Sequence, residues 1–212
     1  MARRHYHYER AFEGFLRARR IPYVAVDEAR KSLVPQVMRG EAGGDAPAAL
    51  KSFDFVIYGI DSCAPGLGLT GNLLVDIKGR RIPPLRRRSA MGGLAAGGPG
   101  RMDSWVTMED VESLGQWERL FGEGFQAVFL FVYACDAQPP DALFQEVFED
   151  RGTWYALRAV TLSAYRGAMK TRSPKWRTVD VPRRVFERIS TPLTVGWNRL
   201  TSDPGPELAA LA

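Results

Sequence analysis

The chain contains the stretch NLLVDIKG at residues 72–79, in which a strongly apolar centre is followed by alternating charged and apolar side chains. Successive side chains of a β-strand point to opposite faces, so this stretch predicts a strand with Asp76 and Lys78 together on one face. A carboxylate there can hold Mg²⁺, and an ammonium group can orient water or offset charge on a phosphate. Taken alone, Asp-x-Lys is more often an exposed ion pair.

The segments around this strand predict an α/β fold. The β-prone segment 53–58 forms a hairpin with residues 72–78, and the apolar run 127–133 predicts a strand buried on both faces. Further strands are expected at 23–26 and 154–161, and helices at 8–19, at 108–121 after a Thr107 cap, and in short pieces near 164–170 and 182–189. The order of elements indicates a mixed central sheet flanked by helices.

Length and composition fit one domain. The 212 residues are 45% hydrophobic and 25% charged, which suits a globular protein with a substantial core. We expect a single domain over residues 1–200, interrupted by a flexible basic loop at about 80–103 that is rich in glycine, proline and arginine, and followed by a frayed tail at 201–212.

The sequence also predicts a cytoplasmic address. The longest apolar run, 127–135, is far shorter than the roughly 20 residues of a membrane-spanning helix, and the basic, aromatic N-terminus does not resemble a signal peptide. Cys63 and Cys135 are expected to be free thiols.

The net charge of +5 points to an anionic partner without identifying it. Basic residues cluster at 17–20, at 80–88 and at 170–177. Such clusters attract nucleic acid by charge and counterion release, but each is about as often a solvated surface.

Two further acids bear on the Asp76–Lys78 pair. Asp54 interrupts an apolar strand, where it either faces Asp76 across the hairpin or sits exposed at the strand start. Glu9 lies in the first turn of the N-terminal helix, with Glu13 one turn further along the same face, and the residues alone do not choose between them.

This layout resembles that of PD-(D/E)xK nucleases: a helix with a glutamate, a strand with an aspartate, Asp-x-Lys, then a helix and a strand. Over roughly residues 8–133 it is most similar to archaeal Holliday-junction resolvases. The resemblance implies a restriction-endonuclease-like core (helix-strand-strand-strand-helix-strand) and favours Glu9 over Glu13. It assigns Asp54 to the first motif, although Phe53 stands where proline is frequent, and Asp76 and Lys78 to the second.

The function so implied is that of a Mg²⁺-dependent DNA endonuclease, with Mn²⁺ as a substitute. Glu9, Asp54, Asp76 and the Ile77 carbonyl would bind the metal, and Lys78 would position the attacking water. The basic loop would close over the phosphate backbone through Arg80, Arg81, Arg86, Arg87 and Arg88. The resemblance further implies a branched substrate and a homodimer. A restriction or repair nuclease on linear DNA, an RNA-directed enzyme and a catalytically silent nucleic-acid-binding module remain open.

Three more residues are candidates for lining the site. The segment 7–13, HYERAFE, is similar to the motif that names the HYExAFE proteins, so His7 and Tyr8 either line the site or pack in the core. Gln116 sits where some PD-(D/E)xK enzymes carry a glutamine near the metal, although exposure on an amphipathic helix is the commoner use of such a residue.

Overall fold

The structure of the protein is a computed structural model that describes residues 6–26, 50–60, 69, 71–82, 102–136, 138 and 146–193. A six-stranded sheet with the order β1-β2-β3-β5-β7-β6 forms its centre. The strands are β1 (Tyr23–Ala25), β2 (Phe55–Ile60), β3 (Gly71–Ile82), β5 (Phe125–Cys135), β6 (Val147–Asp150) and β7 (Thr153–Thr161). The predicted mixed α/β class is therefore confirmed, as is the order helix-strand-strand-strand-helix-strand.

The pairing of β3 decides where the functional groups lie. On one side β3 pairs antiparallel with β2, as the predicted hairpin requires, with Phe55 opposite Val75. On its other side β3 runs parallel to β5 over eleven pairs, from Asn72 with Phe125 to Ile82 with Cys135. The helix α2 (Met108–Phe121) lies between these two parallel strands in the sequence and forms the crossover between them.

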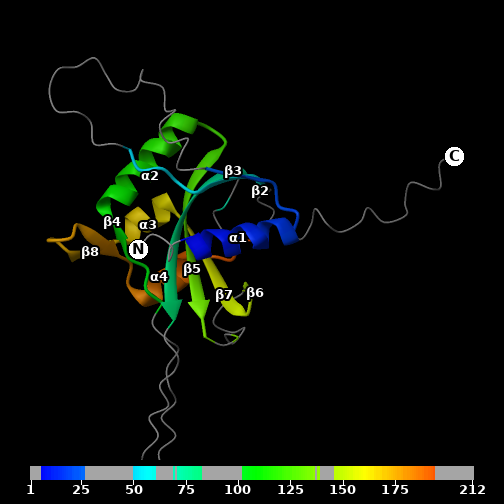
Figure 1. The fold of residues 1–212 in the computed structure, drawn as a ribbon. Helices are drawn as coiled ribbons and strands as arrows, with labels where there is room; N and C mark the ends of the chain where they lie inside the picture. The colour runs from blue at the N-terminus through cyan, green and yellow to red at the C-terminus, as the bar shows by residue number, and fades with distance from the viewer. Residues whose placement is uncertain are drawn as a thin grey trace, which may run out of the picture.

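The two faces of the sheet bury different helices (Figure 1). On one face α1 (Tyr6–Ala18) packs Phe12, Phe15 and Leu16 against the odd-numbered side chains Leu73 and Val75 of β3. On the opposite face α2 and α3 (Leu162–Ala168) pack against even-numbered side chains of β3, such as Leu74, and against Phe129 of β5. β5 is buried on both faces, as its apolar sequence predicts.

A second, smaller sheet has the order β4-β9-β8. Its strands are β4 (Val106–Thr107), β8 (Lys170–Ser173) and β9 (Thr178–Asp180), and the short helix α4 (Arg183–Ile189) follows β9. Because β4 leads directly into α2, this sheet is attached to the N-terminal end of that helix. The predicted helix near 164–170 ends at Ala168, and the polar residues from Lys170 onward form a strand instead.

Several boundaries differ from those expected. β3 runs past Lys78 to Ile82, so Arg80 and Arg81 belong to the strand and not to a loop. Parallel pairing with β5 supplies the hydrogen bonds that extend it. Asp54 immediately precedes β2 and does not interrupt it. Cys63, Arg86, Arg87, Arg88 and the expected tail lie outside the described residues. Within the described part of the chain, no helix has the length and apolar character that crossing a membrane requires.

Candidate active site

Asp54 marks the point at which β2 and β3 part. Its backbone N–H donates to the carbonyl of Val75 at 2.8 Å, which closes the β2–β3 ladder. Its side-chain Oδ2 then accepts the N–H of Ile77 at 2.6 Å, in place of a backbone carbonyl. Beyond Ile77, the pairs that the structure describes for β3 are all with β5. The Asp54 carboxylate is thus fixed at the point where β2 and β3 separate, which we call the fork, next to the residues that follow Val75.

Asp76 and Lys78 share the face of β3 that is covered by α2, as strand alternation predicts. The Lys78 Nζ lies 2.8 Å from the Asp76 Oδ2 and 3.4 Å from the Asp110 Oδ1 of α2. The exposed fractions of these three side chains are 15%, 12% and 12%. The pair is therefore not an exposed surface ion pair: the ammonium group is held between two nearly buried carboxylates.

The charges in this cluster shift its pKa values in opposite directions. Burial is the main cause that raises the pKa of Asp76, to about 7. The positive charge of Lys78 opposes this rise, and the nearby carboxylate of Asp54 adds to it. Burial alone would lower the pKa of Lys78, but Asp76 and Asp110 outweigh it and the net shift is upward. Lys78 is therefore charged at neutral pH, whereas burial makes the Asp76 carboxyl group harder to ionise than an exposed one.

Asp110 is a part of the site that the sequence did not single out. It closes a capping box at the start of α2, in which the Asp110 N–H donates to the Thr107 Oγ1 at 3.1 Å and the Thr107 N–H donates to the Asp110 Oδ2 at 2.9 Å. Burial opposes ionisation, but Lys78 and Thr107 lower the pKa of Asp110 to about 2. The capping box was the sequence signal that could have identified Asp110, because it fixes a carboxylate at the N-terminus of the helix that covers β3.

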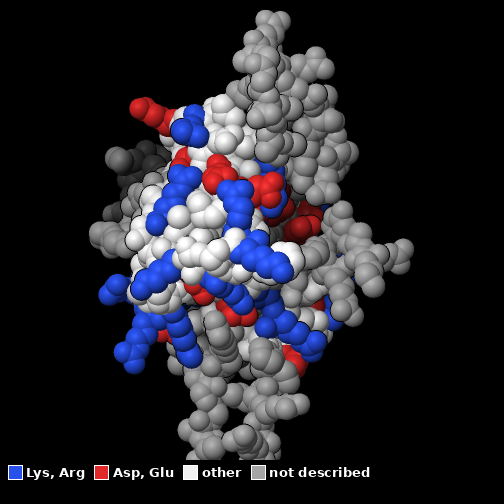
Figure 2. All heavy atoms as spheres, turned by 90° about the vertical axis from the view of Figure 1, so that its left-hand side faces the viewer, with Lys and Arg blue, Asp and Glu red and all other residues white. Residues whose placement is uncertain are grey.

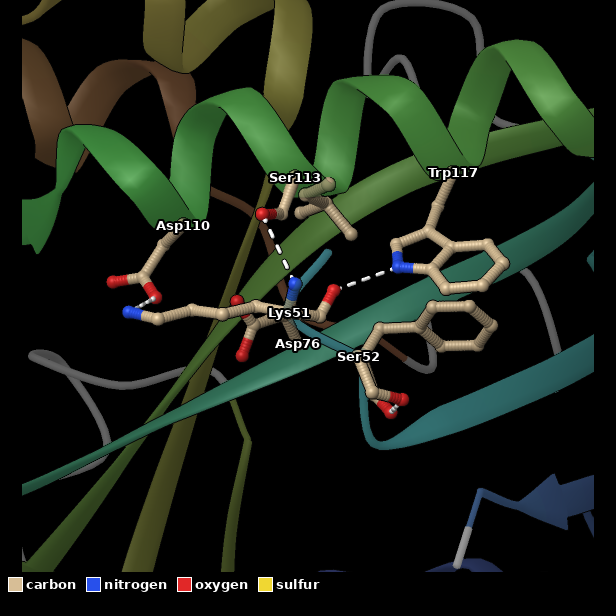
Figure 3. A pocket seen from close by; sticks show the side chains of 8 residues that line it. Lys51, Ser52, Asp76, Asp110, Ser113 and Trp117 are labelled. Atoms are coloured by element: carbon tan, nitrogen blue, oxygen red, sulfur yellow. Dashed lines mark hydrogen bonds and ion pairs between the residues drawn. The ribbon is translucent and has the colours of Figure 1, made fainter. Parts of the chain in front are cut away.

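Lys51 ties the chain before β2 to the same helix (Figure 3). Its Nζ lies 3.1 Å from the Asp110 Oδ1 and 2.8 Å from the Glu109 Oε2. Its N–H donates to the Ser113 Oγ at 3.3 Å, and its carbonyl accepts the indole N–H of Trp117 at 2.7 Å. One residue therefore fastens the segment leading into Asp54 through its backbone and its side chain. No sequence pattern around Lys51 indicates this role.

A narrow crevice lies between this segment, β3 and α2. Its polar lining includes Lys51, Asp76, Asp110 and Ser113, and Trp117 closes one end (Figure 3). The side chains fill it so closely that no water molecule fits inside. A ligand that reaches Asp76 from this side therefore has to displace the Lys51 side chain.

Glu9 lies on α1, the helix on the opposite face of the sheet. The Tyr8 ring packs directly on Gly79, where an added Cβ would fall 2.2 Å from the Tyr8 Cδ2. His7 contacts the Tyr8 ring, and its Nδ1 lies 3.1 Å from the hydroxyl of Tyr155. The first turn of α1 thus lies over β3 just beyond Lys78, with the sheet between them. Participation of Glu9, His7 and Tyr8 in the site stays a prediction.

The remaining predicted residues are spread around the site. Gln116 is exposed on α2 and does not line the crevice, whereas Ser113 and Trp117 do. Arg80 shares the face of Asp76 and Lys78, and its guanidinium carbon lies 4.2 Å from the centre of the Trp105 ring. Arg81 is exposed and pairs with Asp136 at 2.7 Å. Roles for Gln116, Arg80 and Arg81 also stay predictions.

The donor set can be compared with what Mg²⁺ requires. Among the described residues, no group of three His, Cys, Asp or Glu side chains is gathered closely enough to form a closed metal site. Mg²⁺ usually takes one or two carboxylates and leaves its other positions to water and substrate phosphate. Asp54 and Asp76 supply carboxylates of the kind that such an open site uses, and metal binding by them and by the Ile77 carbonyl stays a prediction.

Comparison with known proteins adds little to the site. No family model matches this chain, and none of the curated proteins compared with it matches. Among solved structures, that of Hjc, a Holliday junction resolvase from the hyperthermophilic archaeon Archaeoglobus fulgidus, is similar at 13% identity. Its TM-score is 0.41, and the similarity covers 85% of this chain and 89% of that one. Function is therefore inferred below from the residues of the site.

Proposed function

We propose that this protein is a Mg²⁺-dependent nuclease that hydrolyses phosphodiester bonds in DNA. The observation that carries the proposal is the convergence of Asp54, Asp76 and Lys78 at the fork between β2 and β3. The Asp54 and Asp76 carboxylates repel each other at the fork, and Lys78 offsets only one of their two charges. A divalent cation held by the two carboxylates would supply the remaining positive charge, and Lys78 would then face the phosphodiester.

Asp54 and Asp76, with the Ile77 carbonyl, would hold the ion. Bound there, Mg²⁺ would polarise the phosphoryl group and offset its developing negative charge. The hydrogen bond from the Ile77 N–H fixes the Asp54 carboxylate in orientation before any ligand arrives. Glu9 is proposed as a further ligand, direct or through water, that approaches from the α1 side of the fork.

Lys78 would supply the fixed positive charge of the site. Lys78 pairs with Asp76 at 2.8 Å, and its ammonium group would donate to the attacking water or to a phosphate oxygen if Asp76 held the ion. Asp110 keeps Lys78 charged and anchored, so we assign it a positioning role. Arg80 and Arg81, with Arg86 to Arg88, are proposed to contact the phosphate backbone.

A nucleic-acid-binding module without catalysis is the second candidate. It is favoured by the position of Glu9, because α1 packs on the face opposite Asp76 and the described carboxylates around Lys78 are those of Asp54, Asp76 and Asp110. The two candidates predict different responses to Mg²⁺.

The test is Mg²⁺-dependent nicking of four-way-junction, flap, linear and single-stranded DNA, with single-stranded RNA as a further substrate. Asp76→Asn and Lys78→Met are expected to lower the cleavage rate at least about 100-fold, because each removes a charge that acts on the reacting phosphate. Asp136→Asn is the matched control, since it removes an exposed carboxylate paired with Arg81 outside the fork.

Metal binding is measured independently by titration of Mn²⁺ into the protein without DNA. Asp54→Asn and Asp76→Asn are expected to weaken it, and Asp136→Asn to leave it unchanged. Equal cleavage by the wild type and the Asp76 variant would identify a contaminating nuclease and overturn the proposal. Binding of DNA with no cleavage of any substrate would establish the binding module instead. Preference for the four-way junction, together with a dimer in solution, would support the branched substrate and the homodimer.

A further inference from the structure

The second sheet carries a strongly basic surface that the proposed chemistry does not use. Residues 166–188 contain eight Lys and Arg residues, all exposed, against two Asp and Glu residues. Figure 2 views the side of the molecule on which the β8–β9 hairpin projects, and Lys and Arg side chains spread over it. We refer to residues 170–180, which comprise β8, the turn and β9, as the basic hairpin.

The turn of the basic hairpin presents a tryptophan to solvent. Trp176 is 71% exposed, the largest exposed fraction among the large hydrophobic side chains of the described chain. The Nζ of Lys175 lies 5.5 Å from its ring centre. Exposure of so large an apolar ring to water is unfavourable, and tryptophan is enriched at surfaces that a binding partner covers. Because Trp176 is surrounded by Lys and Arg side chains, the partner that fits this surface is anionic and has flat aromatic groups.

The basic hairpin is also connected to the fork. Val106 and Thr107 of β4 pair with β9, and the carbonyl of Arg177 accepts the N–H of Met108 at 2.8 Å. The turn is therefore fastened to the N-terminus of α2, where Asp110 contacts Lys78. In addition, the guanidinium carbons of Arg80 and Arg172 lie 4.2 Å and 5.3 Å from the centre of the Trp105 ring.

These contacts define a path of positive charge. Lys78 and Arg80 share one face of β3, and Arg172 of β8 meets Arg80 at Trp105. Between this point and the turn, the exposed basic side chains are those of Lys170, Lys175 and Arg177. A polyanion that follows this path would run from the fork to Trp176 along the side of the molecule on which these Lys and Arg side chains lie.

We propose that the basic hairpin binds a single strand of nucleic acid, with Lys170, Arg172 and Lys175 on its phosphates and Trp176 stacked on an unpaired base. The inference rests on the proposed function, because it supplies the strand whose phosphate is cleaved at the fork. A single strand fits better than a duplex, since a tryptophan at the tip of a hairpin can stack on a splayed base but not on one inside a duplex. It follows that substrates with unpaired segments are preferred.

Binding is measured by fluorescence anisotropy of labelled oligothymidine and of a blunt duplex, in EDTA so that no cleavage occurs. Trp176→Ala is expected to weaken single-strand binding by about 5-fold to 150-fold, as loss of one base–aromatic stack does. Trp176→Phe retains a stacking face and is expected to lose little. Lys175→Gln is expected to reduce the slope of log affinity against log salt by about 0.7, the value for one phosphate contact on a single strand.

Arg119→Gln is the matched control. Arg119 is exposed in the last turn of α2, whereas the basic hairpin meets the first turn of that helix. Unchanged melting temperatures show that each variant is folded. Wild-type single-strand affinity in Trp176→Ala and Lys175→Gln would overturn the inference, as would an equal loss in Arg119→Gln or an equal loss on the duplex. If these variants bind normally while Asp76→Asn abolishes cleavage, only the hairpin inference fails. If they lose binding while no substrate is cleaved, only the nuclease proposal fails.

Discussion

Replacing Asp110 by asparagine isolates the charge that holds Lys78 and Lys51. Asparagine has nearly the same shape and keeps an oxygen for the 2.9 Å hydrogen bond from the Thr107 N–H, so the capping box is largely retained. The lost element is the negative charge that lies 3.4 Å from the Lys78 Nζ and 3.1 Å from the Lys51 Nζ. We therefore expect Asp110→Asn to destabilise the fold at neutral pH.

The magnitude follows from the pKa of Asp110, which falls from 3.8 to about 2 on folding. At roughly 1.4 kcal/mol per pKa unit, this shift corresponds to about 2 kcal/mol of stability. Because the folded pKa is depressed, this contribution is complete above the unfolded value and is lost as pH falls through about 2. The difference in unfolding free energy between the wild type and Asp110→Asn should thus be constant near neutrality and shrink in acid.

Urea unfolding followed by circular dichroism measures this difference, and Glu112→Gln is the matched control. Glu112 lies on the same helix and pairs with Arg177 at 3.2 Å, but both side chains are more than half exposed. Such a pair contributes at most about 1 kcal/mol. If Asp110→Asn and Glu112→Gln cost the same at neutral pH, or if the cost of Asp110→Asn grows in acid, Asp110 does not hold the lysines as described.

Other expectations address the remaining contacts. Gly79→Ala forces a Cβ to within 2.2 Å of the Tyr8 ring and should lower the free energy of unfolding by about 1–3 kcal/mol. In a Tyr8→Ala background this loss should largely disappear, and additive losses of stability in the double variant would exclude the contact. Burial and Asp136 raise the pKa of the Cys135 thiol to about 11, so in a Cys63→Ser variant iodoacetamide should label it at mildly alkaline pH only after unfolding. Rapid labelling of the folded variant would refute the burial of Cys135.

The central elements could be predicted because their patterns are local. Alternation placed Asp76 and Lys78 on one face, an unbroken apolar run marked β5, and Thr107 marked the start of α2. The expected hairpin left two positions open for Asp54, facing Asp76 or exposed at the strand start, and in the structure its side chain accepts a backbone hydrogen bond from Ile77. Each of these inferences needed only strand or helix geometry.

The missing parts depend on packing between distant segments. Asp110 and Lys51 reach the site only because α2 covers the even-numbered face of β3, which no periodicity reveals. The same choice of face separates α1, and with it Glu9, from the Asp76 side chain. β8 escaped prediction because KTRS has no apolar alternation: it is an edge strand, and its hydrogen-bond partner is the central strand β9.

The attachments of Val26 and Lys51 bear on how this protein tolerates change in length. The Val26 N–H donates to the Asp54 carbonyl at 2.8 Å, and Lys51 is bonded to α2 at its N–H and at its carbonyl. The chain on both sides of residues 27–49 is therefore clamped at the fork itself. Asp54 therefore takes its position from contacts outside residues 27–49, and we expect an insertion in that interval to leave its carboxylate in place. The interval is thus a natural position for grafting a reporter or affinity tag without disturbing the neighbouring carboxylates.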